Sequence, residues 1–146
     1  MRIMPPTLFW LCILLMIPLA WVWPLVTVFP APYSVVGVVP LCAGLWFAIW
    51  GSRKFEQVGT TIKTFDQPDR LVTDGLFRIS RNPMYLGFVL TLVGIWFVLG
   101  ALSPLLGVLL FLVVADRWYI PFEERMLRAK FNGEYGAYCA QTRRWV

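Results

Sequence analysis

The sequence contains no histidine, and only 14% of its 146 residues are charged. The missing histidine excludes imidazole general bases, histidine-ligated metals and Ser/His or Cys/His nucleophilic pairs. Cysteine is also rare: Cys12, Cys42 and Cys139 lie far apart without a CxxC pair, so we expect no disulfide framework and no metal site. Any chemistry must therefore rely on carboxylates, guanidinium groups, tyrosines, the backbone or a cofactor.

Hydrophobic residues, in contrast, make up 59% of the chain. A soluble domain of this size cannot bury so much apolar surface, so the composition indicates an integral membrane protein. The net charge is +5, but the basic residues lie beside apolar runs, where anionic lipid headgroups are nearer than nucleic acid. We therefore expect contact with a membrane and no nucleic-acid partner.

The apolar residues form four runs, at 7–29, 35–50, 84–100 and 105–120. A membrane-spanning helix needs roughly 20 residues, so each run predicts one span. The short links at 30–33 and 101–104 indicate two helical hairpins. We expect the first run to be retained rather than cleaved as a signal peptide, because it is long and contains Pro18 and Pro24.

These runs predict an all-α membrane protein with four transmembrane helices, folded as a single domain over residues 1–146. Its parts are a first hairpin (1–51), a cytoplasmic loop (52–82), a second hairpin (83–120) and a cytoplasmic amphipathic tail (121–146). The loop and the tail together form what we call the cap.

Positive charge is confined to the start of the chain, the central loop, and the end of the last apolar run with the tail that follows it. The positive-inside rule therefore places both termini and the cap in the cytoplasm, and the small size and compact loops favour a bacterial inner membrane. The basic residues are Arg2, Arg53, Lys54, Lys63, Arg70, Arg78, Arg81, Arg117, Arg125, Arg128, Lys130, Arg143 and Arg144.

The end of the central loop is typical of a helix start, because Asn82 is a favoured N-cap and Pro83 suits the first helical position. Free amides and the positive dipole end at such a start favour an anion, and Arg78 and Arg81 add charge beside it. The alternative interpretation is an ordinary capped helix with arginines that contact lipid.

The second polar segment follows the last apolar run, where Pro121 is expected to start a new turn and Asn132 to break the helix. Glu123 and Glu124 point about 100° apart on a helix, so one can face the bundle while the other meets solvent. A carboxylate at membrane depth suggests function. The alternative is that both favour a helix N-terminus and pair with Arg128.

Together these segments resemble the isoprenylcysteine carboxyl methyltransferase and phospholipid methyltransferase family of membrane enzymes. The resemblance runs from about Phe55 to Trp145. It rests on the order and spacing of four elements, which are Leu71-Val72-Thr73-Asp74-Gly75-Leu76-Phe77-Arg78, Arg81-Asn82-Pro83-Met84-Tyr85-Leu86-Gly87, Glu123-Glu124, and Phe131 with Tyr135 and Tyr138.

The resemblance implies an S-adenosylmethionine-dependent methyltransferase without a Rossmann domain, with its cofactor between the last two membrane helices and the cap. The acceptor would be a lipophilic small molecule, a lipid or a lipid-linked carboxylate, thiol or amine. The implied cofactor-binding residues are Arg78, Arg81, Asn82, Pro83, Tyr85, Leu86, Gly87, Glu123 and Glu124. Arg117 and Arg144 are candidate catalytic residues that would hold an acceptor carboxylate or phosphate, unless they only contact lipid headgroups.

One departure concerns the acceptor. Enzymes that act on prenylated cysteine usually carry His where this chain has Asn82, whereas some phospholipid N-methyltransferases carry Asn there. Two other interpretations stay open: a related NADPH-dependent, sterol-reductase-like membrane enzyme, suggested by Tyr135-Gly136 and Tyr138-Cys139, and a membrane bundle that binds a partner without catalysis. The sequence leaves the oligomeric state open.

Overall fold

The computed structural model describes residues 3–59 and 69–146, and these residues form helices and connecting segments without a β-strand. Arg2 and Lys63, which entered the topology prediction, lie outside the described residues. The elements in chain order are α1 (Pro5–Val22), η1 (Tyr33–Gly37), α2 (Val38–Val58), η2 (Gly75–Arg78), α3 (Pro83–Leu99), α4 (Leu105–Val114), η3 (Ala115–Tyr119) and α5 (Ile120–Gln141).

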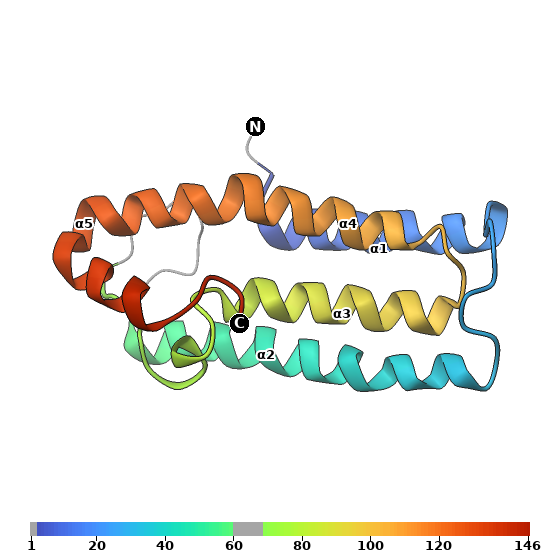
Figure 1. The fold of residues 1–146 in the computed structure, drawn as a ribbon, viewed down its shortest axis with the longest axis horizontal. Coiled ribbons are helices and arrows are strands. Elements are labelled where there is room, and N and C mark those ends of the chain that lie inside the picture. The colour runs from blue at the N-terminus through green and yellow to red at the C-terminus, as the bar shows by residue number, and fades with distance from the viewer. Residues whose placement is uncertain (1–2, 60–68) are drawn as a thin grey trace.

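Three helical segments are long and apolar enough to cross a bilayer, namely Pro5–Val22, Tyr33–Val58 and Leu105–Gln141. Helix α3 is equally apolar but has 17 residues, so it is a shorter candidate. The all-helical membrane class is therefore supported, and the count of four spans stays a prediction. All four helices lie side by side, with both links at the end opposite the cap (Figure 1).

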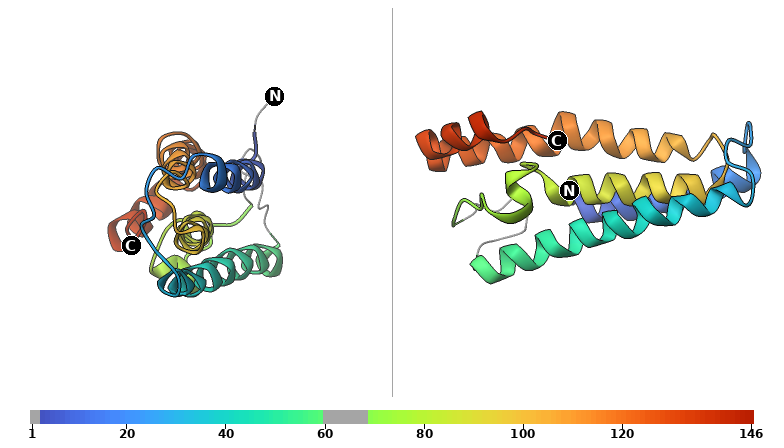
Figure 2. Two further views of the ribbon diagram at one scale, coloured as in Figure 1. Left: turned by 90° about the vertical axis from the view of Figure 1, so that its right-hand side faces the viewer. Right: turned by 60° about the horizontal axis from the view of Figure 1, so that its bottom comes forward.

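The first predicted hairpin does not pack as a pair. Helix α1 packs against α4 and α3, whereas α2 packs mainly along α3, as the end-on view in Figure 2 shows. The first run also ends as a helix at Val22 rather than at 29. Residues beyond it form an extended link that hydrogen-bonds to the second link, with Val28 N donating to Gly100 O at 2.7 Å and Leu102 N donating to Val26 O at 2.9 Å.

Glycine explains why α2 selects α3. Gly44 faces Gly87 and Thr91, and about two helical turns earlier Gly37, at the end of η1, faces Gly94. A Cβ atom on Gly44 would lie 2.5 Å from the Gly87 carbonyl oxygen, so the two backbones touch directly. Small residues allow this close packing in membranes, where apolar burial alone does not drive helices together.

The close contact between α2 and α3 predicts that Gly44→Ala destabilises the protein by about 1–3 kcal/mol, because the added methyl group forces the helices apart. Gly136→Ala is the matched control, since no atom lies within 4 Å of a Cβ placed there. Thermal unfolding in detergent, followed by tryptophan fluorescence, measures both. Equal melting temperatures for the two variants would contradict the glycine contact.

Two helical segments are longer or more continuous than predicted. Helix α2 continues through residues 52–58, which were predicted as loop. It ends before Gly59, whose backbone adopts the left-handed conformation. Helices α4 and α5 are joined by η3, a turn of π-helix, and Pro121 lies at the start of α5, where a new turn was predicted, although the helical segment is continuous. The wider π-turn relieves the clash that a proline ring makes with the preceding turn.

The predicted break at Asn132 is confirmed by its non-helical backbone, with φ 33° and ψ −107°. After this kink α5 turns back toward the bundle, and the chain ends beside the start of α3 (Figure 1). The kink therefore brings residues after 132 onto the polar end of the membrane helices.

Candidate functional site

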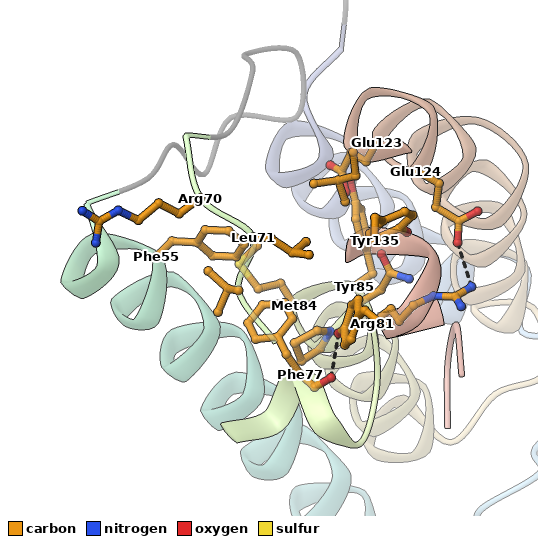
Figure 3. Close-up of a pocket in the computed structure, with 15 residues that line it drawn as sticks. Phe55, Arg70, Leu71, Phe77, Arg81, Met84, Tyr85, Glu123, Glu124 and Tyr135 are labelled. Carbon is orange, nitrogen blue, oxygen red and sulfur yellow. Dashed lines mark hydrogen bonds and ion pairs between the residues drawn. The ribbon is translucent and has the colours of Figure 1, made fainter. Parts of the chain in front are cut away.

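A cavity lies where the start of α3, the end of α2 and both parts of α5 meet (Figure 3). It has a volume of about 590 Å³, its open mouth included. The lining residues are Phe55, Arg70, Leu71, Val72, Phe77, Arg81, Asn82, Pro83, Met84, Tyr85, Glu123, Glu124, Leu127, Tyr135 and Tyr138. One wall is thus polar and another is aromatic.

The start of α3 supplies part of the polar wall. Asn82 and Pro83 occupy the N-cap and first helical positions, which confirms the predicted helix start. The Asn82 side chain makes no capping hydrogen bond, so that part of the prediction is wrong. Its amide nitrogen instead donates to the carbonyl oxygen of Arg144 at 3.0 Å, because the returning tail lies against this helix end.

Glu124 is buried, with 7% of its surface exposed, and two arginines hold its carboxylate. Arg81 Nη2 donates to Oε1 at 3.0 Å, while Arg144 Nη2 donates to Oε2 at 2.8 Å and Arg144 Nε to Oε1 at 3.2 Å. The hydrogen bonds to Glu124 raise the pKa of Arg144. The alternative pairing of Glu124 with Arg128 is wrong, because the fold brings Arg81, just before α3, and Arg144, after α5, to this carboxylate.

Glu123 lies on the cavity wall, where the Tyr85 hydroxyl donates to its Oε1 at 2.7 Å. Tyr85 is 5% exposed, and its ring stacks on Tyr119 with centroids 6.2 Å apart. The adjacent glutamates therefore have different partners: Glu123 meets a phenol at the cavity, and Glu124 meets guanidinium groups.

The guanidinium of Arg81 joins the cavity to the tail. Its Nη1 donates to the carbonyl oxygens of Thr142 at 3.1 Å and Cys139 at 3.3 Å, in addition to the Glu124 contact. Its buried Nε has no hydrogen-bond partner among the described residues. The backbone N–H of Arg81 also donates to the Arg143 carbonyl at 3.0 Å. Arg81 thus fixes the tail over the helix start.

The aromatic wall was not predicted as part of the site. The Tyr138 hydroxyl donates to the Phe77 carbonyl oxygen at 2.6 Å, and Tyr135 is 1% exposed. Phe55 packs edge-on against Phe77, which connects this wall to the end of α2. The helical spacing of Tyr135 and Tyr138 was the available signal, but it did not reveal that the kink at 132 folds them onto the cavity.

Other predicted residues lie apart from the cavity lining. Arg78 is exposed on η2, and Gly87 packs against α2. Leu86 is half-buried outside the lining, and Arg117 is exposed beside Asp116. Arg144 does not line the cavity but contacts it through Glu124.

The structure therefore brings together only some of the predicted cofactor-binding residues. Those that line the cavity are Arg81, Asn82, Pro83, Tyr85, Glu123 and Glu124.

An ion pair outside the cavity lining ties the segment before η2 to α2. Lys54, near the end of α2, donates to the Asp74 carboxylate just before η2. This hydrogen bond holds the pKa of Asp74 below its usual range. The ion pair helps to keep the segment before η2 against α2.

A helical membrane protein with a polar cavity at one end of its helices is thus the class defined by the fold and the site. Residues 32–134 match the phospholipid methyltransferase family, and the chain belongs to that family. This confirms the resemblance noted in the sequence. No solved structure shows a significant match.

Individual relatives are shorter or more distant. The chain is 38% identical over 63 residues to an uncharacterized protein of Haemophilus influenzae, which covers 43% of this chain and 100% of that protein. It is 35% identical over 81 residues to probable protein-S-isoprenylcysteine O-methyltransferases of Oryza sativa subspecies indica and japonica. That match covers 53% of this chain but 41% of the rice proteins, so the chain matches less than half of their length.

Proposed function

We propose that the chain is an S-adenosylmethionine-dependent methyltransferase that binds its cofactor in the cavity and methylates a lipophilic or lipid-linked acceptor at the cytoplasmic interface. The observation that carries the proposal is that residues at the entry to α3 and on α5 line one cavity, namely Arg81, Asn82, Tyr85, Glu123 and Glu124. These residues belong to the segments that carry the resemblance to the family. The acceptor group is a carboxylate, a thiol or an amine.

The side chains present suit the charges of this cofactor. The carboxylate of the ligand can bind Arg81 beside the N-terminal amides of α3. The buried Nε of Arg81 lacks a partner among the described residues. The ammonium group or a ribose hydroxyl can bind Glu123, and the adenine can pack against the aromatic wall of Phe55, Phe77 and Tyr135. The donor set therefore fits S-adenosylmethionine.

Bound S-adenosylmethionine supplies an electrophilic methyl group on a sulfonium centre. The protein needs to align the acceptor with that methyl group and to exclude water, and no strong general base is needed for a carboxylate or thiolate. Tyr85 and Glu123 line the cavity directly. Arg144 holds Glu124 in place from outside the lining, so we assign it a positioning role rather than direct contact with the cofactor.

Titration calorimetry of S-adenosylmethionine on the detergent-purified protein tests the proposal. We expect binding, and we expect Glu123→Gln to weaken it at least about tenfold because the cavity loses a charged acceptor. Glu134→Gln is the matched control, since Glu134 is exposed on α5 and does not line the cavity. Binding of NADPH without S-adenosylmethionine, or binding of neither, would contradict the proposal.

A further inference from the structure

A second hollow lies on the outer face of the long helix formed by α4, η3 and α5. We call it the outer groove, and it is lined by Leu112, Val113, Asp116, Arg117 and Trp145. It shares no lining residue with the cavity described above. The outer groove is therefore a separate feature, apolar along α4 and charged at η3.

Hydrogen bonds and an ion pair form the charged end of the groove. Asp116 accepts a hydrogen bond from Trp145 Nε1 at 3.0 Å and another from Arg144 Nη1 at 3.4 Å. Both bonds end on Oδ1, while Oδ2 lies 3.6 Å from Nε of Arg117. The carboxylate thus holds the indole as one wall and is itself balanced by two guanidinium groups. The lining of the groove thus holds one carboxylate, Asp116, and one guanidinium, Arg117, while Arg144 reaches the same carboxylate from outside the lining.

The side chain of Arg117 is 83% exposed, so its guanidinium is accessible at the surface. It lies twelve residues from Leu105, the first residue of α4, which corresponds to about 18 Å along the helix. The face between them is apolar and exposed at Leu109, Leu110 and Val113, as expected where lipid chains cover a membrane helix. Arg117 therefore stands at the end of a lipid-covered strip.

Trp118 also indicates that Arg117 lies at the boundary between lipid headgroups and hydrocarbon. Its side chain is 63% exposed beside Arg117, and exposed tryptophans concentrate at the boundary between headgroups and hydrocarbon. An arginine at this depth, with an open fork of N–H donors, matches a phosphate in shape and charge. The adjacent groove along Leu112 and Val113 matches an acyl chain.

We propose that the outer groove binds a membrane phospholipid, with its phosphate on Arg117 and an acyl chain along Leu112 and Val113. This lipid is distinct from the methyl acceptor, because the groove and the cavity have separate walls. Arg144 connects the two sites, since the same guanidinium contacts Asp116 in the groove and Glu124 at the cavity. The proposal goes beyond methyl transfer and does not depend on it.

Native mass spectrometry of the delipidated protein in detergent tests the site. Dioleoylphosphatidylglycerol is titrated against wild type, Arg117→Gln and Arg125→Gln, with monoolein as a lipid that has no phosphate. Arg125 is the matched control, because it is exposed on the same continuous helix outside the groove. We expect Arg117→Gln to weaken retention of one phospholipid about tenfold, Arg125→Gln to leave it unchanged, and monoolein not to be retained.

Two outcomes would overturn the proposal. Equal retention by wild type and Arg117→Gln, or equal retention of monoolein, would show that the groove takes apolar chains without recognising phosphate. Displacement of the phospholipid by inorganic phosphate would assign the site to a soluble anion instead of a lipid. None of these measurements uses S-adenosylmethionine, so the lipid-binding test stays valid even if the methyltransferase proposal fails.

Discussion

Glu124→Ala is expected to lower the free energy of unfolding by about 3 kcal/mol. Removing one partner of a buried ion pair leaves the other charges without compensation, and this costs more than the loss of an exposed pair. Here the carboxylate joins Arg81, just before α3, to Arg144 near the end of the tail, and its side chain is 10% exposed. Reversible unfolding of the protein in mixed detergent micelles measures the change.

Glu134→Ala provides the control, because Glu134 is exposed on the same helix. The double mutant Glu124→Ala with Arg144→Ala separates the effect of this ion pair from the effect of each substitution on the helix. The losses of unfolding free energy in the two single variants should be less than additive by about 1–3 kcal/mol. A loss below about 1 kcal/mol in Glu124→Ala would contradict a structural role for this carboxylate. A loss of cofactor binding in this variant alone would not show direct contact, which is why Glu123→Gln carries the binding test.

Much of the membrane part was predictable from residue patterns. The apolar runs located the helices, and Asn82-Pro83 marked the start of α3. The pairing of helices was harder, because periodic hydrophobicity does not say which faces meet when lipid surrounds the bundle. The α2–α3 contact depends on Gly44 against Gly87, a complementarity between two distant segments.

The candidate site was predictable in its parts but not in its geometry. The motifs identified Arg81 and the two glutamates, yet Glu123 and Glu124 have partners that are 38 and 43 residues away in sequence. Their separate roles follow from the kink at Asn132 and the returning tail, whose carbonyl groups cover the α3 start. Local patterns do not contain such long-range contacts.

Arg81→Lys should reduce the affinity for S-adenosylmethionine by at least about tenfold, because lysine keeps the charge but loses the planar fork of donors. The Arg81 guanidinium reaches Glu124 and the Thr142 carbonyl while lining the cavity. A single ammonium cannot make these contacts and also meet an anionic ligand. Calorimetry measures the affinity, and a melting temperature recorded alongside separates loss of binding from loss of fold.

Arg78→Lys is the informative comparison, because the sequence placed Arg78 and Arg81 together in the cofactor site. Arg78 is exposed on η2 and does not line the cavity, so its affinity should match that of wild type. Unchanged affinity in both variants would show that general positive charge attracts the ligand, because lysine keeps the charge at each position. A loss confined to Arg81→Lys would show that binding depends on the one guanidinium that the tail and Glu124 hold against the start of α3.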